Sequence, residues 1–426
     1  MTWCLLSLFI GLSALGLPLA VALGAASAAT LWLYDLPLSV VAQFMYTSVN
    51  SFLLLAVPLF ILAGLIMDRG GLSERIFAAA EVVVGHFRGG LGHVNIVASF
   101  VFGGISGSAI ADVTSLGPLE IKAMTARGYP RPYSAALTMI TATLSSIVPP
   151  SILMIIAAAA AGVSVGGALA GGLGPATVLL VGFLIVNYIW SRRFGFGTPV
   201  EIGLRSGIPV LLRSLPSTGA PIIILGGMFS GIVTPTEAAA LAVAYTLLVA
   251  TVVHRELAVV ELPGLLIKAG RTAGTVLLIV MVASVATYVF TIDGLPQRIT
   301  AAVLAVTRDP TLVMLFIGVV LVIVGMFMEI IAASLILIPV LMPMITAVGI
   351  DPIHFIVFLV TALSMGLATP PVGTCLFATA QISGVSIERL SLAAIPFYVV
   401  NLIVLIIIAV VPQTVLWPVR WLTGFG

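Results

Sequence analysis

Long, uninterrupted apolar runs are the feature that most limits how this chain can fold. The runs at 273–291 and 395–418 contain no charged residue at all. Over the whole chain only 8% of residues are charged, whereas a soluble domain has about 25%, and the mean hydropathy is +1.28. This composition predicts an integral membrane protein with many spans. It excludes a soluble enzyme, a nucleic-acid-binding protein and a secreted disulfide scaffold.

The predicted spans are helices rather than the strands of a barrel. Barrel strands alternate apolar and polar residues, and these runs do not alternate. A helix satisfies its backbone hydrogen bonds internally, as the interior of a bilayer requires. The fold class is therefore predicted to be an all-α, polytopic membrane protein.

Nothing in the sequence indicates a cofactor, a metal centre or ATP hydrolysis. No Walker A loop is present, and Cys4 and Cys375 lie too far apart in apolar runs to suggest a disulfide framework. The net charge of +2 argues against a nucleic-acid partner. The four histidines are scattered along the chain: His86, His93, His254 and His354. We therefore expect no enzymatic activity and no cofactor.

Polar residues and chain breakers divide the apolar runs into predicted segments. Pro149-Pro150 interrupts the segment at 133–161, and Pro370-Pro371 interrupts the one at 353–380. The full set covers residues 3–15, 18–34, 51–67, 72–85, 92–125, 133–161, 175–190, 217–231, 236–253, 273–291, 296–308, 311–347, 353–380 and 395–418.

An internal repeat relates the two halves of the chain. At an offset of 221 residues, Pro149-Pro150 coincides with Pro370-Pro371 and Gly104 coincides with Gly325. Three further pairs share this register: Pro118 with Pro339, Gly128 with Gly349, and Leu116 with Leu337. Each half then consists of helices, a hairpin-like run and a helix broken at a proline doublet. Paired interruptions of this kind favour a transporter binding site, because the backbone groups that a break frees cannot face lipid.

The basic residues predict opposite orientations for the two halves. If the loop around Lys122, Arg127 and Arg131 is cytoplasmic, all but three of the 17 basic residues lie inside. The exceptions are Arg298, Arg308 and Arg420. Both termini then lie outside, and the runs at 92–125 and 311–347 are expected to be re-entrant hairpins opening to opposite sides. If each run instead crossed the membrane twice, the loops would lie on the same sides. The basic residues therefore support the orientation but not the re-entrant hairpins. The segments at 72–85 and 296–308 are read as arms along the membrane plane or as ordinary connecting helices.

The first hairpin tip and the first helix break offer hard oxygen ligands. The tip, 103–115, is rich in Gly, Ser and Thr and contains Asp112, and it faces the hydroxyl-rich break at 143–151. Hydroxyl, carboxylate and freed carbonyl oxygens suit Na⁺ as they suit other hard cations. The equivalent place in the second half combines Gly325, Glu329 and Ser334 with the break at 366–374.

These residues also have plainer interpretations. Gly and Ser in membrane helices often serve helix packing alone, and prolines often only kink a helix. Asp112 and Glu329 favour a functional role, since charge at membrane depth is costly. Glu237 fits a helix-start carboxylate after Thr234-Pro235-Thr236 at least as well as a functional residue. The loop bases, Lys268 among them, are interpreted as topology determinants.

Four motifs together resemble the large membrane subunit of tripartite ATP-independent periplasmic (TRAP) transporters. They are Ser106-Gly107-Ser108-Ala109-Ile110-Ala111-Asp112, the stretch Ser145 to Ser151, the stretch Gly226 to Ala239 with its Thr234-Pro235-Thr236-Glu237, and Gly366 to Gly373. The resemblance covers essentially the whole chain. Pro118 and Glu120-Ile121-Lys122 depart from the family pattern, which affects the expected ligand geometry rather than the class.

The resemblance implies a Na⁺-driven importer of a small organic acid, such as a dicarboxylate, sialic acid or a sugar acid, in the bacterial inner membrane. It implies an elevator mechanism, a small four-helix membrane subunit and a soluble periplasmic binding protein as partners. The small subunit is expected to be a separate chain, since no four-helix segment precedes Met1. The alternative is a stand-alone ion-coupled carrier of organic anions that needs no binding protein.

The resemblance also implies residues for each site. One Na⁺ site would use the first tip with the first break, a second would use the second hairpin with the second break, and substrate would lie between the tips. The implied Na⁺ ligands are Ser106, Gly107, Ser108, Asp112, Ser145, Ser146, Val148, Pro150, Gly325, Glu329, Gly366, Ala368, Thr369 and Pro371. The implied substrate ligands are Ser108, Asp112, Ser146, Thr369 and Thr374.

The expected division of the chain follows the repeat. Residues 92–165 and 311–385, each a hairpin with its broken helix, form the transport domain. Residues 1–91 and 166–310 form the scaffold with the two arms, and residues 386–426 form a C-terminal helix.

Overall fold

The computed structural model describes residues 1–200 and 204–424. Every regular element in these stretches is a helix, as the apolar runs predict. Eight of the described helical segments are long and apolar enough to cross a membrane. They are Phe52–Arg69, Val165–Phe194, Gly207–Phe229, Pro235–Val253, Val259–Ile292, Pro310–Phe327, Ile330–Val348 and Ile387–Val410.

The first half of the chain contains a helical hairpin followed by a broken helix. Its elements are α1 (Thr2–Ala14), α2 (Leu19–Leu33), α3 (Ser39–Val49), η1 (Phe52–Leu55), α4 (Ala56–Arg69), α5 (Leu72–Val84), α6 (Gly90–Ser106), α7 (Ala109–Ser115), α8 (Gly117–Ala126), α9 (Arg131–Thr141), η2 (Ala142–Ser146), α10 (Ile152–Ala161) and α11 (Val165–Phe194). The hairpin comprises α6, α7 and α8, and the broken helix comprises α9, η2 and α10.

The second half repeats this pattern. Its elements are α12 (Leu204–Phe229), α13 (Pro235–Leu248), η3 (Val249–Val253), η4 (Val259–Glu261), α14 (Leu262–Ile292), α15 (Leu295–Val306), α16 (Pro310–Phe327), α17 (Ile330–Val348), α18 (Pro352–Leu367), α19 (Thr374–Ser383), α20 (Ile387–Val410) and α21 (Gln413–Thr423). Here the hairpin comprises α16 and α17, and the broken helix comprises α18 and α19.

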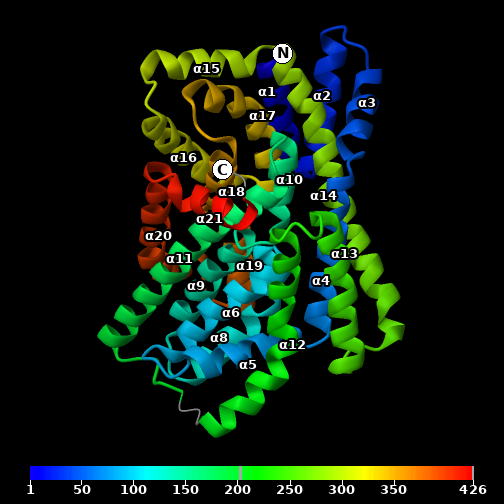
Figure 1. Cartoon of the computed structure of the whole chain (residues 1–426). Coiled ribbons are helices and arrows are strands. Elements are labelled where there is room, and N and C mark those ends of the chain that lie inside the picture. Colours follow the sequence, from blue (N-terminus) through cyan, green and yellow to red (C-terminus); the bar gives the residue numbers. More distant parts are fainter. Residues whose placement is uncertain (201–203, 425–426) are drawn as a thin grey trace.

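The repeat is inverted. The arms α5 and α15 lie at opposite ends of the molecule in Figure 1, near the bottom and at the top respectively. Each arm follows a glycine in the left-handed conformation, Gly71 at φ +68° and Gly294 at φ +70°. A β-carbon is unfavourable in that conformation, so the matched glycines explain why the chain turns sharply into both arms.

Several helix limits differ from the sequence-based segments. The helix α3 is missing from the prediction, because Gln43, Thr47 and Ser48 interrupt its apolar pattern. The helix α14 begins at Leu262 instead of 273, since Lys268 and Arg271 end the apolar run without ending the helix. The predicted segment at 175–190 is only the second part of α11, whose helix continues through Pro175.

The last predicted segment, 395–418, is also wrong as a single helix. The helix α20 ends at Val410, and α21 begins at Gln413 after Pro412. Proline has no N–H to donate and restricts the residue before it to extended conformations. The break at this proline therefore turns the end of the chain into a separate short helix.

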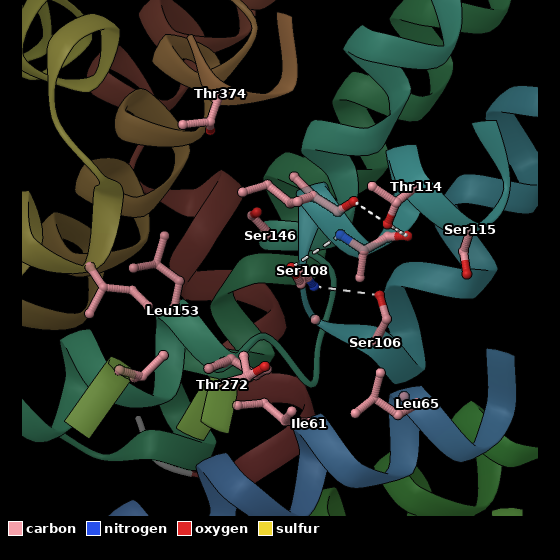
Figure 2. A pocket seen from close by; sticks show the side chains of 18 of the residues that line it. Ile61, Leu65, Ser106, Ser108, Thr114, Ser115, Ser146, Leu153, Thr272 and Thr374 are labelled. Atoms are coloured by element: carbon pink, nitrogen blue, oxygen red, sulfur yellow. Dashed lines mark hydrogen bonds between the residues drawn. The ribbon is translucent and has the colours of Figure 1, made fainter. Parts of the chain in front are cut away.

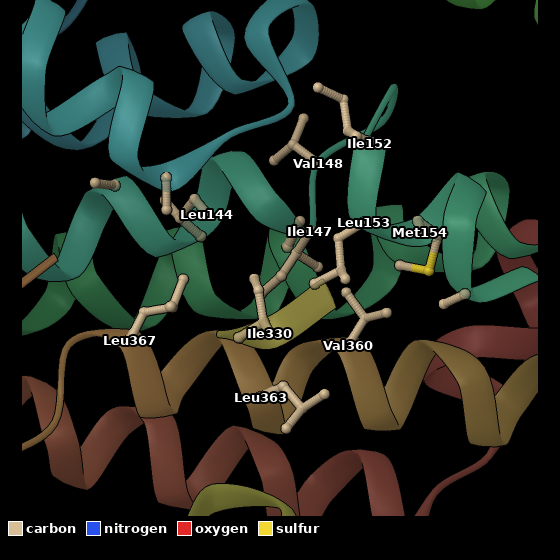
Figure 3. Packing of buried hydrophobic residues seen from close by; sticks show 14 of the residues in the cluster. Leu144, Ile147, Val148, Ile152, Leu153, Met154, Ile330, Val360, Leu363 and Leu367 are labelled. Carbon is tan, nitrogen blue, oxygen red and sulfur yellow. The ribbon is translucent and has the colours of Figure 1, made fainter. Parts of the chain in front are cut away.

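The two broken helices pack against each other in the middle of the molecule. Figure 3 shows Ile147 and Leu153 of the first facing Val360 and Leu363 of the second, with Ile330 between them. All five side chains are at most 8% exposed. This apolar layer holds the two proline breaks close to the two hairpin tips.

Candidate functional site

The first hairpin tip rests directly on the first proline break. Gly107 adopts φ +59°, and a β-carbon there would lie 2.5 Å from the carbonyl oxygen of Pro150. Ser108 then begins α7, where its Oγ accepts a hydrogen bond from the backbone N–H of Ala111 at 3.4 Å. Only glycine fits a backbone approach this close. The sequence Ser106-Gly107-Ser108 thus places two hydroxyls beside the break.

The first break largely satisfies its own backbone groups. Ser151 Oγ donates to the carbonyl oxygen of Ser146 at 2.5 Å and accepts from the N–H of Met154 at 3.1 Å, which caps α10. The N–H of Val148 donates to the carbonyl oxygen of Leu144 at 2.8 Å. The cap fixes the direction of α10, whose N-terminus points toward the tip.

The second break is held partly by a neighbouring helix. The hydroxyl of Tyr398, on α20, donates to the carbonyl oxygen of Ala368 at 2.6 Å, and Thr369 Oγ1 donates to the carbonyl oxygen of Met365 at 2.7 Å. In the hairpin opposite, Glu329 caps α17 by accepting from the N–H of Ala332 at 2.9 Å. Two predicted oxygen ligands, those of Ala368 and Glu329, therefore already have protein partners.

A cavity of about 370 Å³ connects the two halves. Six of the predicted site residues line it: Ser106, Gly107, Ser108, Ser146, Glu329 and Thr374. Figure 2 shows Ser106, Ser108 and Ser146 of the first half in the same pocket as Thr374 of the second. Thr272 of α14 and Ile61 of α4 form part of the opposite wall. The cavity thus lies between the hairpin tips and two helices of the predicted scaffold.

Asp112 lies behind the tip and does not line this cavity. Its carboxylate is fully buried, accepting from Ser145 Oγ at 2.6 Å and from Ser99 Oγ at 3.3 Å. In this conformation Asp112 joins the tip to the first broken helix. Its predicted contact with substrate, and the ion-ligand role of both Asp112 and Ser145, remain predictions.

The other predicted ligands lie outside the lining of the cavity. They are Val148, Pro150, Gly325, Gly366, Ala368, Thr369 and Pro371. Gly325 and Gly366 meet backbone to backbone, since a β-carbon on Gly366 would lie 2.4 Å from the carbonyl carbon of Gly325. This contact brings two predicted residues of the second ion site together away from the cavity, whereas a third, Glu329, lines it.

The sequence did not predict a role in the site for two charged residues of the cavity wall. Asp68 of α4 and Lys268 of α14 both line the cavity, and Asp68 accepts a hydrogen bond from Ser115 Oγ. Lys268 was interpreted as a loop residue because α14 was expected to begin at 273. The signal was present in the spacing: Thr272 follows Lys268 by four residues, so both occupy one helical face.

Glu237 forms the helix cap that the sequence suggests. Its carboxylate accepts from the N–H of Thr234 at 2.7 Å, while Thr234 Oγ1 accepts from the N–H of Glu237. This reciprocal pair is a capping box. Glu237 is not in the wall of the cavity. Among the described residues, no group of three or more His, Cys, Asp or Glu side chains is arranged to hold a metal ion.

Comparison with known proteins identifies relatives along nearly the whole chain. Residues 6–414 match the family model described as the DctM component of tripartite ATP-independent periplasmic transporters. The sialic acid TRAP transporter large permease SiaM of Vibrio cholerae is 36% identical over 386 residues, which are 90% of each chain.

The isethionate TRAP transporter permease DctMQ of Oleidesulfovibrio alaskensis is 36% identical over 399 residues. The match covers 93% of this chain but only 63% of that relative, so this chain spans less than two thirds of its length. Among solved structures, the YdaH transporter of Alcanivorax borkumensis has a TM-score of 0.60 at 14% identity, covering 89% of this chain and 90% of that one. At this identity the structural likeness concerns the fold alone.

Proposed function

Because the chain belongs to the family of DctM components of TRAP transporters, multi-pass proteins of the inner membrane, we propose that it imports a small organic acid and that a Na⁺ gradient drives this uptake. The proposed substrates are dicarboxylates, sialic acid and sugar acids. Two relatives are named for isethionate and sialic acid, which are both acids. The relatives are transporter permeases, not enzymes.

The cavity between the tips is the observation that carries this proposal. Ser108, Ser146 and Thr374 offer hydroxyl donors from both halves of the repeat. Lys268 supplies a cation from the opposite wall and forms no ion pair with any described side chain. Hydroxyls and an ammonium group are suitable partners for a carboxylate or sulfonate. A volume of about 370 Å³ lies within the range usual for small-molecule sites.

Na⁺ is proposed to bind where each tip meets its broken helix. The ligands would come from Ser106, Ser108 and Ser145 in the first half, and from Glu329 and Thr369 in the second. Carbonyl and hydroxyl oxygens next to a helix break suit a hard monovalent cation. The proximity of Gly107 to Pro150 and of Gly325 to Gly366 supports both positions.

An elevator movement is proposed for the transport step. The hairpins and broken helices would move as a unit against α4 and α14, and the hairpins would enter the membrane from opposite sides. The support is the position of the cavity, whose wall includes residues from both predicted domains: the tips on one side, and Ile61, Lys268 and Thr272 on the other.

A small membrane subunit and a periplasmic binding protein are proposed as partners, as the family description suggests. The test is uptake of labelled succinate, N-acetylneuraminate and isethionate into proteoliposomes. The full system should accumulate one of them only with Na⁺ outside, the small subunit and the loaded binding protein. Uptake that persists after all three are removed would contradict the proposal. Uptake by this chain alone with Na⁺ would favour the stand-alone carrier.

A further inference from the structure

A buried polar cluster in the first hairpin lies outside the proposed transport site. Asn95 of α6 donates through Nδ2 to Oε2 of Glu120 and to Oγ1 of Thr138, both at 2.7 Å. These contacts join α6 to α8 and to α9. Glu120 is 0% exposed, so its carboxyl group is removed from solvent in the middle of this three-helix contact.

The second oxygen of Glu120 has no hydrogen-bond partner among the described residues. No described Lys, Arg or His nitrogen lies within 4.0 Å of the carboxyl group either. A negative charge on Asp112 opposes a second one on Glu120, whereas the hydroxyl of Thr138 favours it. The ionisable side chains on α8 and on the helices packed against it are Asp112, Lys122, His93, Tyr133, Arg131 and Cys375. Of these, Lys122 and Arg131 are exposed.

An ionised carboxylate is poorly accommodated in such a place. Burying a charge without a counter-charge is strongly unfavourable, and a carboxyl group in that situation usually binds a proton instead. The amide of Asn95 and the nearby hydroxyl of Thr138 do not replace the hydration of a full negative charge, and a charge on Asp112 adds repulsion. We propose that Glu120 is a proton-binding site and that its carboxyl group is protonated in this conformation.

A row of polar side chains within hydrogen-bond distance of one another links this proton to the first hairpin tip. Asn95 Oδ1 accepts from Thr141 Oγ1 at 2.8 Å, and Ser99 Oγ lies 3.4 Å from Thr141 Oγ1 with one proton that it can donate either there or to Asp112. Ser99 Oγ also lies 3.3 Å from the carboxylate of Asp112. The path therefore runs from Glu120 to Asp112 through side chains alone.

This path connects the proton on Glu120 to ion binding at the first tip. This inference rests on the proposed Na⁺ coupling. A cation held near Asp112 stabilises the ionised form of Glu120, so Na⁺ binding favours release of the proton. By linkage, protonation of Glu120 weakens Na⁺ binding to the same extent. Acid therefore opposes Na⁺ binding at the first site.

Infrared spectroscopy in Na⁺-free buffer tests the proton site without any substrate. Wild-type protein at neutral pH should show the C=O stretch of a protonated carboxyl group, and Glu120→Gln should lose part of that band. Glu74→Gln, which changes an exposed acid of α5, should retain the band in full. An unchanged band in folded Glu120→Gln protein overturns the proposal.

A second sample decides the question if Glu120→Gln does not fold. Glu329→Gln protein with ¹³C-labelled glutamate carboxyl groups lacks the glutamate of the cavity wall, and the remaining described glutamates apart from Glu120 are at least partly exposed. Any protonated band that shifts with the label then belongs to Glu120, and a spectrum in which no such band shifts refutes the proton site.

The linkage between proton binding and Na⁺ binding is tested by titrating the protein with Na⁺ at pH 6 and at pH 8. The rise in melting temperature along each titration gives the apparent Na⁺ affinity. The apparent Na⁺ affinity of the wild type should fall on acidification by up to about tenfold per pH unit, as for one proton against one ion. In Glu120→Gln it should be equal at the two pH values, and a dependence retained there overturns the linkage. No effect of Na⁺ on the wild type at either pH contradicts the Na⁺ coupling, while the infrared result still decides the proton site.

Discussion

The two hairpin units, residues 90–161 and 310–383, share one fold but are held together by different means. In both, a glycine brings the hairpin against the broken helix: Gly103 approaches Ser145 in the first unit, and Gly325 approaches Gly366 in the second. Only the first unit adds buried side-chain hydrogen bonds between its own helices, through Asp112 and Asn95, whereas His354 of the second unit bonds outward to the carbonyl oxygen of Ile408 in α20.

Polar side chains of the second unit bond mostly within their own helices. Thr361 donates to the carbonyl oxygen of Val357 and Ser334 to that of Ile331. Its acid, Glu329, caps its own helix and reaches the cavity. The comparison teaches that a duplicated fold keeps its backbone contacts while the copies diverge in their polar chemistry. The first unit contains a buried hydrogen-bond network around two acids, whereas the acid of the second unit lies at the cavity wall.

The strongest test of this difference is Asp112→Ala. The change leaves the hydroxyls of Ser145 and Ser99 without their shared acceptor and removes a predicted ion ligand. Loss of two charge-assisted hydrogen bonds, about 3 kcal/mol, corresponds to a reduction of about 100-fold in Na⁺-driven uptake. Uptake is measured in proteoliposomes, with membrane insertion checked separately. The control is Glu388→Ala, an exposed acid of α20, and wild-type uptake by the Asp112 variant would count against the site.

Gly366→Ala tests the backbone contact in the second unit. The new methyl group would lie 2.4 Å from a backbone atom of Gly325, so the two helices must separate. We expect a loss of stability of about 3 kcal/mol from overpacking, measured by unfolding in detergent.

The matched control for this variant is Gly349→Ala, at the turn between α17 and α18. Gly349 has φ +81° and open space around its Cα, so only the backbone conformation is penalised, by about 1–2 kcal/mol. Equal losses of stability in Gly366→Ala and Gly349→Ala would show that the backbone contact between α16 and α18 does not contribute to stability.

Lys268→Gln tests whether the cavity wall outside the two units takes part in recognising the acid. Removal of the ammonium group should raise the half-saturating substrate concentration about tenfold, as for one charged hydrogen bond. Lys268→Arg should keep most of the affinity, and Lys122→Gln, on the exposed face of α8, should behave as wild type. Unchanged saturation in Lys268→Gln would remove this residue from the substrate site.

The smallest expected effect concerns the arm of the second half. Asp293 accepts hydrogen bonds from Thr2 and Arg298, and these partners, chiefly Thr2, hold the pKa of its carboxyl group well below the usual range. A lowered folded-state pKa contributes stability above the unfolded value, about 3.9, that disappears as the pH falls through the folded value.

Asp293→Asn should therefore melt at a lower temperature than wild type near pH 7, and the difference should shrink as the pH is lowered below about 4. Melting curves over this range check the expectation. A difference that is constant with pH would mean that the charge of Asp293 does not support the arm. Asp309→Asn, the helix cap before α16, serves as the comparison.

Much of the fold was predictable, because the bilayer makes apolar runs and proline breaks unusually informative. The matched doublets at 149–150 and 370–371 predicted two broken helices, and the structure has them. Charges inside helices caused the main errors in limits, as at Lys268 and Arg271 in α14. Pro175 illustrates the opposite case, a breaker that the long helix α11 accommodates.

The candidate site was less predictable than the fold. Motifs identified Ser106, Ser108 and Ser146 beside the cavity, since small hydroxyl residues at a turn mark close backbone approach. The sequence did not reveal that Asp112 points away from the cavity, or that Tyr398 bonds to the second break. Both facts depend on contacts between helices far apart in the chain, which periodicity and spacing do not encode.

The glycine contact between α16 and α18 also limits how the protein moves. Where two main chains touch with no side chains between them, there is nothing that can change rotamer to let one slide past the other. We therefore expect the second hairpin and its broken helix to move as one unit in the proposed transport step. In the proposed movement, the side chains that α14 presents to the cavity, Lys268 and Thr272 among them, would have to change their contacts.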